Sequence, residues 1–284
     1  MYPPDDPYLV YRLFGFLTIR WYAVMILGGA MLAAWFGARR VGRRGYDPEH
    51  AWNLLALGLI TAIIFARAWY VFFEWPNFRG KPLLYIINPG TGGIAIHGAI
   101  LGAVLGAFLY TRFQKLRFLE WLDLGAPCMA IGQAIGRWGN FFNQEAYGRP
   151  TTLPWGLRID REHRVGPYQD LETYGEATRF HPTFLYESIW NAGVVAALLL
   201  IERRFRRRLL DGDLFLIYGI LYSLGRLWIE GLRTDSLCSN GIGGSCAGAF
   251  RTAQVVSLAV IVGFSVILAI RHARRTLSTS PAQP

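Results

Sequence analysis

The sequence predicts an all-α, multi-pass membrane protein, and three observations carry that prediction. Of the 284 residues, 53% are hydrophobic and 15% are aromatic, whereas only 17% carry a charge. Seven segments approach the roughly 20 apolar residues that cross a bilayer as a helix. Arginines gather in every second connection between these segments. We therefore expect about seven transmembrane helices rather than a soluble domain.

The predicted spans are apolar stretches that follow one another along most of the chain. They cover residues 19–38, 52–73, 94–111, 118–138, 183–201, 214–231 and 253–270. Polar side chains interrupt the fourth and sixth spans. Ahead of the first span, Asp5 and Asp6 replace the basic start of a cleavable signal peptide. Aromatic residues suit the headgroup layer, so residues 8–16 are expected to form a short interfacial helix.

The distribution of Lys and Arg predicts the orientation. The connections after the first, third and fifth spans and the segment after the seventh are basic, and they include Arg39, Arg40, Arg43, Arg44, Arg112, Lys115, Arg117, Arg203, Arg204, Arg206, Arg207, Arg208, Arg271, Arg274 and Arg275. Basic loops remain in the cytoplasm, which places the N-terminus outside and the C-terminus in the cytoplasm. The net charge of +10 is thus explained by topology, and no nucleic-acid partner is expected.

One membrane domain accounts for residues 1–275. Within it, residues of about 142–182 mix charges with prolines and alternating apolar residues, which predicts a small folded cap of short strands on the periplasmic or extracellular face. Residues 276–284 are rich in Ser, Pro and Gln and are expected to be disordered.

The three cysteines, Cys128, Cys238 and Cys246, do not have the spacing of a metal site, and no metal or cofactor is expected. Cys128 lies in an apolar run, as a packing residue does. Cys238 and Cys246 enclose a loop rich in Gly and Ser. They can form a disulfide only where that loop meets an oxidising compartment, and the sequence leaves this question open.

Polar side chains in the fourth span face one way. On a helix, Gln133, Arg137 and Asn140 are spaced by four and three residues, so they share one face. Glu145 follows a few residues later. Because an unpaired charged or amide group in lipid costs several kcal/mol, about 3 on insertion scales for Arg, this segment is a candidate site.

The sixth span carries a narrower stripe. Its members, at i, i+4, i+8 and i+11, are Tyr222, Arg226, Glu230 and Arg233. Arg226 and Glu230 can pair, which leaves an excess positive charge. One interpretation is an ion-pair ladder that holds helices together. The other is an anion site for a phospholipid headgroup, because the planar guanidinium of arginine binds phosphate oxygens bidentately and stays charged.

His97 is the only histidine inside a predicted apolar span. It precedes Gly98, Gly102 and Gly106, a small-residue stripe that lets another helix approach closely. A histidine at such a place can make an interhelical hydrogen bond or act as a general base, and both roles stay open.

Two other polar residues are given structural roles. Arg67, in the second span, is expected to extend toward the interface or to pair with Asp123. His181 is expected to cap the start of the helix that carries Glu187.

The segment 136–148 also resembles a known signature, G-R-x-G-N-F-x-N-x-E-x-x-G. Its fixed positions are all present as Gly136, Arg137, Gly139, Asn140, Phe141, Asn143, Glu145 and Gly148. Other matches follow in the same order along most of the chain, namely Ile19 to Tyr22, His97-Gly98, His181-Pro182 with Leu185 to Glu187, and Gly225-Arg226 with Glu230 and Arg233 to Asp235. The chain resembles the prolipoprotein diacylglyceryl transferases, membrane enzymes that lipidate bacterial lipoprotein precursors. Ala99 departs from the pattern, which has glycine there, and the loop between Cys238 and Cys246 lies outside it.

The resemblance implies transfer of a diacylglyceryl group from phosphatidylglycerol to the lipobox cysteine in the signal peptide of a prolipoprotein. It implies a place in the bacterial plasma (inner) membrane, with the active site toward the outer leaflet. The implied catalytic residues are His97, Arg137, Arg226 and Tyr222. The implied phosphatidylglycerol-binding residues are Arg137, Asn140, Asn143, Glu145, Arg226, Glu230 and Arg233.

Two other functions use the same residues. A transporter or flippase of anionic lipid would use the arginines as its binding site, although the sequence has no clear internal repeat. A structural membrane protein would use them as ion pairs between helices.

Overall fold

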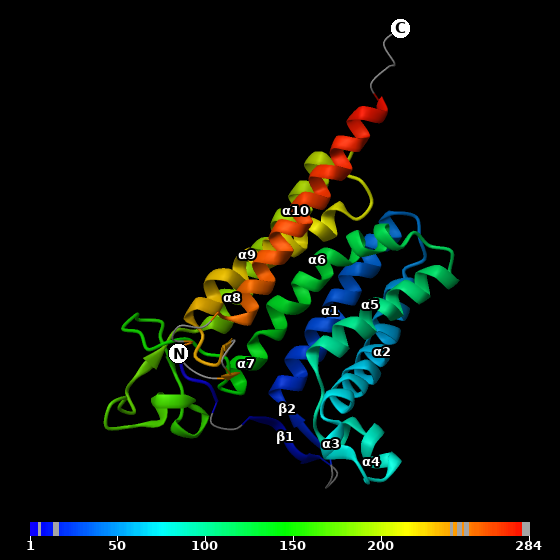
Figure 1. Cartoon of the computed structure of the whole chain (residues 1–284). Coiled ribbons are helices and arrows are strands. Elements are labelled where there is room, and N and C mark those ends of the chain that lie inside the picture. Colours follow the sequence, from blue (N-terminus) through cyan, green and yellow to red (C-terminus); the bar gives the residue numbers. More distant parts are fainter. Residues whose placement is uncertain (5–6, 14–16, 239–240, 243–245, 247–249, 280–284) are drawn as a thin grey trace. The chain divides into compact units, whose positions relative to one another are not determined.

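The computed structural model describes residues 1–284 except 5–6, 14–16, 239–240, 243–245, 247–249 and 280–284, and it is dominated by long helices (Figure 1). The long helices are α1 (Trp21–Arg43), α2 (Glu49–Phe73), α5 (Ile96–Phe113), α6 (Phe118–Gly136), α8 (Thr183–Phe205), α9 (Asp213–Leu232) and α10 (Thr252–Thr279). Three short helices are α3 (Trp75–Phe78), α4 (Leu83–Ile87) and α7 (Trp138–Phe142). The prediction of a multi-pass helical membrane protein is confirmed.

Six of the described helices are long and apolar enough to cross a membrane, namely α1, α2, α5, α8, α9 and residues Thr252–Arg275 of α10. The fourth predicted span is helical as α6, but that helix is outside this group. Its 19 residues rise about 28 Å, close to the thickness of the hydrocarbon core. Glu120 and Asp123 lie near its start, and both are buried. A total of seven spans therefore stays a prediction.

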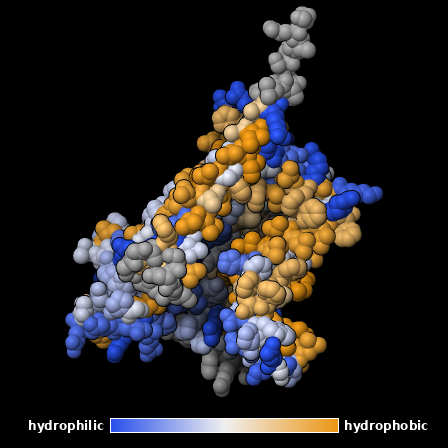
Figure 2. Space-filling view, viewed as in Figure 1, coloured by the Kyte–Doolittle hydropathy of each residue, from blue (hydrophilic) through white to orange (hydrophobic). Residues whose placement is uncertain are grey.

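The chain divides into two compact units, residues Met1–Ala33 with Gly125–Pro284, and residues Ala34–Leu124. In the first, helices α8, α9 and α10 lie side by side (Figure 1). A buried cluster joins α6, α8 and α9 through Ala126, Ala130, Val194, Leu198, Leu214 and Tyr218. Hydrophobic residues cover much of the visible surface of the long helices, as lipid contact requires, whereas hydrophilic residues gather around residues 150–180 (Figure 2).

The second unit is built on the close packing of α2 against α5. A Cβ atom added to Gly98 would collide with the carbonyl oxygen of Phe65, and one added to Gly102 would collide with that of Thr61. A Cβ atom added to Gly106 would likewise collide with the hydroxyl of Thr61. The predicted small-residue stripe is confirmed, since only glycine permits this approach.

The structural role expected for Arg67 is confirmed, but its partners are backbone carbonyls rather than Asp123. Its buried guanidinium donates hydrogen bonds to the carbonyls of Tyr85, Ile86 and Gly93 at 2.7–3.0 Å, and also to that of Gly92. A further bond reaches the hydroxyl of Thr91 at 2.9 Å. Arginine has five donors in a planar fork, so one side chain satisfies several carbonyls of an irregular segment that has no ladder of its own. Arg67 thereby fixes the chain that leads into α5.

The N-terminal segment is a hairpin rather than the expected interfacial helix. Strand β1 (Tyr8–Leu13) pairs antiparallel with β2 (Leu17–Arg20), with Tyr8 opposite Arg20. Aromatic and β-branched residues favour strands, which explains the difference. Residues 14–16 of the expected helix lie outside the described residues.

Residues 148–182 form a small folded region. Strand β3 (Leu157–Arg158) pairs antiparallel with β4 (Arg179–Phe180), and two 3₁₀ turns, η2 (Arg161–His163) and η3 (Gly166–Gln169), lie between them. The core beneath comprises Tyr147, Leu157, Ile159, Phe180 and Phe184. Burial raises the pKa of Tyr147 to about 12. At the other end of the chain, α10 continues to Thr279, so the first residues of the expected disordered tail are helical and 280–284 lie outside the described residues.

Candidate active site

The signature segment begins at the last residue of α6 and includes α7, and two of its glycines have no room for a side chain. A Cβ atom on Gly139 would lie 2.7 Å from the ring of Tyr22. A Cβ atom on Gly148 would lie 2.7 Å from that of His181. Carbon atoms do not approach this closely without distortion. The glycines of the signature therefore let α1 and the segment before α8 pack against it.

The polar residues of the signature form one hydrogen-bonded chain. The guanidinium of Arg137 donates to Oδ1 of Asn140 at 3.4 Å. Asn140 and Asn143 donate from their side-chain amides to Oε1 of Glu145, at 2.9 and 3.3 Å. Gln144, at a left-handed φ of 52°, points away and pairs with Asp160. The structure thus brings together all four of the predicted side chains in this segment.

Glu187, in the second turn of α8, is the centre of the site. Its side chain is only 3% exposed. One carboxylate oxygen lies 2.7 Å from Nε of Arg137, and the other accepts a hydrogen bond from Arg226 at 3.0 Å. A third guanidinium, that of Arg233, lies 3.9 Å away. One carboxylate therefore joins the signature segment to helix α9.

The stripe on α9 is confirmed in part. Arg226 and Glu230 pair as predicted, one turn apart. Arg233, however, is the residue after the helix, in an extended conformation. It binds Asp235 through two parallel hydrogen bonds of 2.9 and 2.7 Å. Burial by itself lowers the pKa of Arg233, but the hydrogen bonds to Asp235 and the nearby carboxylates outweigh it and raise the pKa above its usual value.

The ion pairs balance the charges of the cluster. Three arginines, Arg137, Arg226 and Arg233, meet three carboxylates, those of Glu187, Glu230 and Asp235. The excess positive charge expected on α9 alone is therefore compensated by Asp235, which pairs with Arg233, and by Glu187, which contacts Arg226. Because each guanidinium has five N–H donors, the contacts with Glu187, Glu230 and Asn140 do not use the full capacity of Arg137 and Arg226. Their side chains retain 23% and 14% exposure.

The chain is similar to known proteins along most of its length. A sequence model of prolipoprotein diacylglyceryl transferase matches residues 8–270. A phosphatidylglycerol–prolipoprotein diacylglyceryl transferase of Chloroflexus aggregans is 54% identical, with 100% of this chain and 96% of the relative covered. Enzymes of the same name from Gloeobacter violaceus and Thermosynechococcus vestitus are each 45% identical, over 89% and 87% of this chain and 88% and 86% of their own.

The chain belongs to the prolipoprotein diacylglyceryl transferase family. It is a membrane transferase of lipoprotein biosynthesis, as the resemblance of the signature implied.

Two further predicted catalytic residues of this transferase, Tyr222 and His97, take part in ring contacts. Tyr222, one turn before Arg226 on α9, stacks on Tyr218 with ring centroids 6.0 Å apart. His97 belongs to the other compact unit, where it is exposed near the start of α5. Its ring stacks on Trp69 at 6.4 Å.

Sequence reasoning missed the central role of Glu187. His181, expected to cap α8, instead contacts the hydroxyl of Tyr186 through Nδ1 at 3.1 Å, and burial lowers its pKa. The residue that precedes α8 is Pro182. A signal for Glu187 was present nevertheless: a carboxylate inside an apolar span is expensive unless it has a cationic partner, and the flanking spans carried arginines.

Proposed function

We propose that this transferase moves the diacylglyceryl group of phosphatidylglycerol to the thiol of a lipobox cysteine in a prolipoprotein signal peptide. A C–S bond forms between the cysteine sulfur and the terminal carbon of the glyceryl group. The bond from that carbon to the phosphate oxygen breaks, and glycerol phosphate leaves with the electron pair. The thiol proton passes to a base.

The phosphate is held by Arg137 and Arg226. The observation that carries this assignment is the single carboxylate of Glu187, which contacts both guanidiniums. It fixes two planar donors on different helical segments so that their remaining N–H groups converge on one anion. Donors fixed in advance stabilise the charge that grows on the leaving phosphate. Asn140, Asn143 and Glu145 orient Arg137.

The other site residues act around this pair. Glu230 holds Arg226, Arg233 adds positive potential beside Glu187, and Tyr222 lies one turn from Arg226 as a hydrogen-bonding group. His97 acts as the base that takes the thiol proton. A free thiol titrates near 8.5, so a base or a field of cations must assist its ionisation. If the arginines alone suffice, His97→Gln keeps its activity at neutral pH, and that result would remove His97 from the base role.

The enzyme crosses the bacterial plasma membrane seven times, with its N-terminus outside and its C-terminus in the cytoplasm. In that orientation the signature, the residue Glu187 and the folded region 148–182 lie toward the outer leaflet. The basic ends of α1, α5, α8 and α10 then face the cytoplasm, as the positive-inside rule requires.

A product assay tests the proposal. Purified protein in detergent is mixed with phosphatidylglycerol and a peptide that carries a lipobox cysteine, and the peptide is analysed by mass spectrometry. We expect a gain of one diacylglyceryl group, lost in Arg137→Ala and retained in the control Arg79→Ala, an exposed arginine outside the cluster. Intact phosphatidylglycerol and unmodified peptide, with a folded protein, would instead favour binding or transport of anionic lipid.

A further inference from the structure

The end of helix α9 is a junction between the signature and the chain that leads to α10. The backbone N–H of Arg149 donates to the carbonyl of Leu232 at 2.8 Å. The hydroxyl of Thr234 donates to the carbonyl of Tyr147 at 2.9 Å. Because Arg226 and Glu230 occupy the last two turns of α9, any shift of this end moves the residues that face Glu187.

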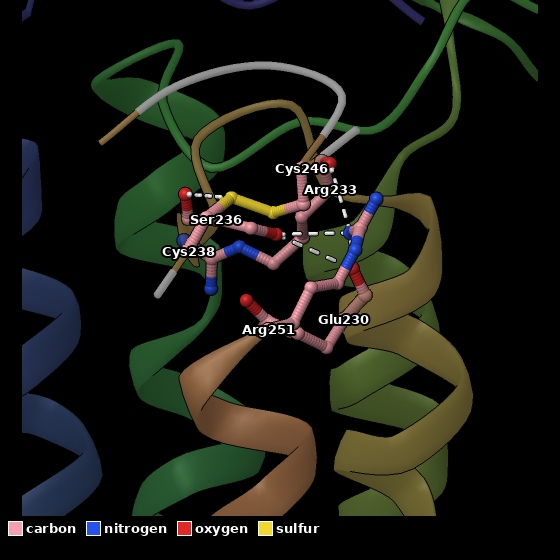
Figure 3. Close-up of a disulfide and its surroundings, with 6 residues drawn as sticks. All are labelled: Glu230, Arg233, Ser236, Cys238, Cys246 and Arg251. Atoms are coloured by element: carbon pink, nitrogen blue, oxygen red, sulfur yellow. Dashed lines mark hydrogen bonds between the residues drawn. A yellow bond between two sulfur atoms is a disulfide. The ribbon is translucent and has the colours of Figure 1, made fainter. Parts of the chain in front are cut away.

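Arg251, the residue before α10, holds the same end of α9 from the other side. It is buried, with 7% exposure. Its guanidinium donates to the carbonyl of Glu230, to that of Arg233 at 3.3 Å and to the hydroxyl of Ser236 at 2.9 Å. The last carbonyls of a helix have no partner within it, and here an arginine from a distant part of the chain supplies one. Figure 3 shows the guanidinium directed at these groups.

A disulfide lies directly beside this arginine. Cys238 and Cys246 are bonded, with Cα atoms 5.5 Å apart, so the disulfide that the sequence left open is present (Figure 3). The backbone of Cys238 pairs with that of Arg251 in an isolated antiparallel bridge. The covalent link thus closes the chain only five residues before Arg251, and it restricts the positions that this residue can take relative to Ser236.

We propose that Arg251 is a positioning residue of the transferase, held in place by the Cys238–Cys246 disulfide, and that it keeps Arg226 and Glu230 in register with Glu187. This inference rests on the proposed function, because it assigns Arg251 an effect on the phosphate site. Arg251 touches the backbone of α9 and not the proposed substrate. Its loss therefore lowers turnover by misplacing Arg226.

The test compares Arg251→Met and Arg251→Lys with wild type in the lipobox-peptide assay. Arg164→Met is the matched control, because Arg164 is also a buried arginine that donates to backbone carbonyls, those of Ile159, Tyr174, Gly175 and Glu176. At a temperature well below each Tm, we expect kcat/KM to fall at least tenfold in Arg251→Met, mostly in kcat, and less in Arg251→Lys. Arg164→Met lowers Tm but keeps kcat/KM within about twofold.

A second arm removes the disulfide without touching the arginine. A phosphine reductant with water converts the disulfide into two thiols and becomes the phosphine oxide. We expect the reduced enzyme and the variant Cys238→Ala/Cys246→Ala to lose about threefold or more in kcat. The variant itself should not respond to the phosphine, whereas Cys128→Ala should respond as wild type does. Cys128 lies in α6, outside this loop.

Failure of the inference and failure of the proposed function give different results. If oxidised wild type makes no product, the proposed function fails. If wild type makes product but folded Arg251→Met does so at the same rate, or loses activity only as much as Arg164→Met, the positioning role is wrong. Should Arg251→Met not fold, unchanged kcat in the reduced enzyme and in Arg251→Lys would overturn it.

Discussion

Replacing Glu187 by glutamine removes the negative charge that holds two arginines together while it keeps the size of the side chain. In the structure, each oxygen of Glu187 serves one guanidinium, at 2.7 Å from Arg137 and 3.0 Å from Arg226. A glutamine offers one acceptor oxygen, and its NH₂ group points donor hydrogens at the other guanidinium. One contact therefore becomes repulsive, and both lose their charge assistance.

The expected loss of kcat in Glu187→Gln follows from these two contacts. The contact with Arg226 is a hydrogen bond and that with Arg137 is an ion pair. A hydrogen bond to a charged group contributes about 1.5–3 kcal/mol, so loss of this bond together with weakening of the ion pair removes about 3 kcal/mol of positioning energy. If this energy is realised in the transition state, kcat falls about 100-fold, since 1.36 kcal/mol corresponds to tenfold. KM for phosphatidylglycerol should not rise in parallel, because the cluster gains a net positive charge that attracts the phosphate.

The assay measures kcat and KM for phosphatidylglycerol with a fixed lipobox peptide, alongside Tm. Glu120→Gln is the matched control: Glu120 is also a buried glutamate, 7% exposed at its side chain, and it pairs with Arg117 at 2.7 Å and Arg44 at 3.6 Å in the other unit. Both variants should lose stability, but only Glu187→Gln should lose turnover. A folded Glu187→Gln enzyme with kcat within threefold of wild type would refute the central role of this carboxylate.

Three further predictions follow from the packing and the charges. Gly148→Ala should lower the free energy of unfolding by about 1–3 kcal/mol through the clash with His181, whereas Gly175→Ala, which meets no atom within 4 Å, should not; urea titration distinguishes them. Arg67→Met should cost about 3 kcal/mol or more and speed hydrogen exchange in α4, because several carbonyls lose their donor at once. His181 has a lowered pKa through burial, so the folded protein favours its neutral form; this contribution is complete above the ordinary pKa of 6.5 and is lost as the pH falls below it. The variant His181→Gln should accordingly show a flatter fall of Tm with acidification, and an unchanged slope would contradict this account.

Hydropathy and local spacing predicted most of the helical fold. The apolar spans, the glycine stripe of α5 and the i, i+4 pair on α9 are local patterns, and the structure confirms them. The N-terminal hairpin and the backbone partners of Arg67 were not predicted. The hairpin is local, but its strand-favouring residues were interpreted as an interfacial helix because they are also aromatic. The role of Arg67 depends on carbonyls 18 and 19 residues later in the chain, which the sequence pattern of one segment does not specify.

In the candidate site, too, contacts between residues close in sequence were predicted and contacts between distant segments were not. The signature supplied Arg137, Asn140, Asn143 and Glu145 as a connected group, because their contacts lie within a few residues. Glu187 was underestimated, because its partners come from two other helical segments. Counting charges along α9 alone therefore gave an excess cation that the folded protein does not have.

The balanced charge of this cluster is informative about the reaction that we propose. A surplus of buried arginines would bind any anion tightly, substrate and product alike, and would be costly to maintain without a ligand. Glu187 acts as an internal counter-ion to the arginines. The lipid phosphodiester has one negative charge, and it accepts hydrogen bonds only from the guanidinium N–H groups that do not already bind this carboxylate. As the C–O bond breaks, the leaving phosphate acquires a second charge, because a phosphomonoester carries about −1.5 to −2 at pH 7. The arginines then gain most at the transition state and not in the bound lipid, which is the condition for raising kcat.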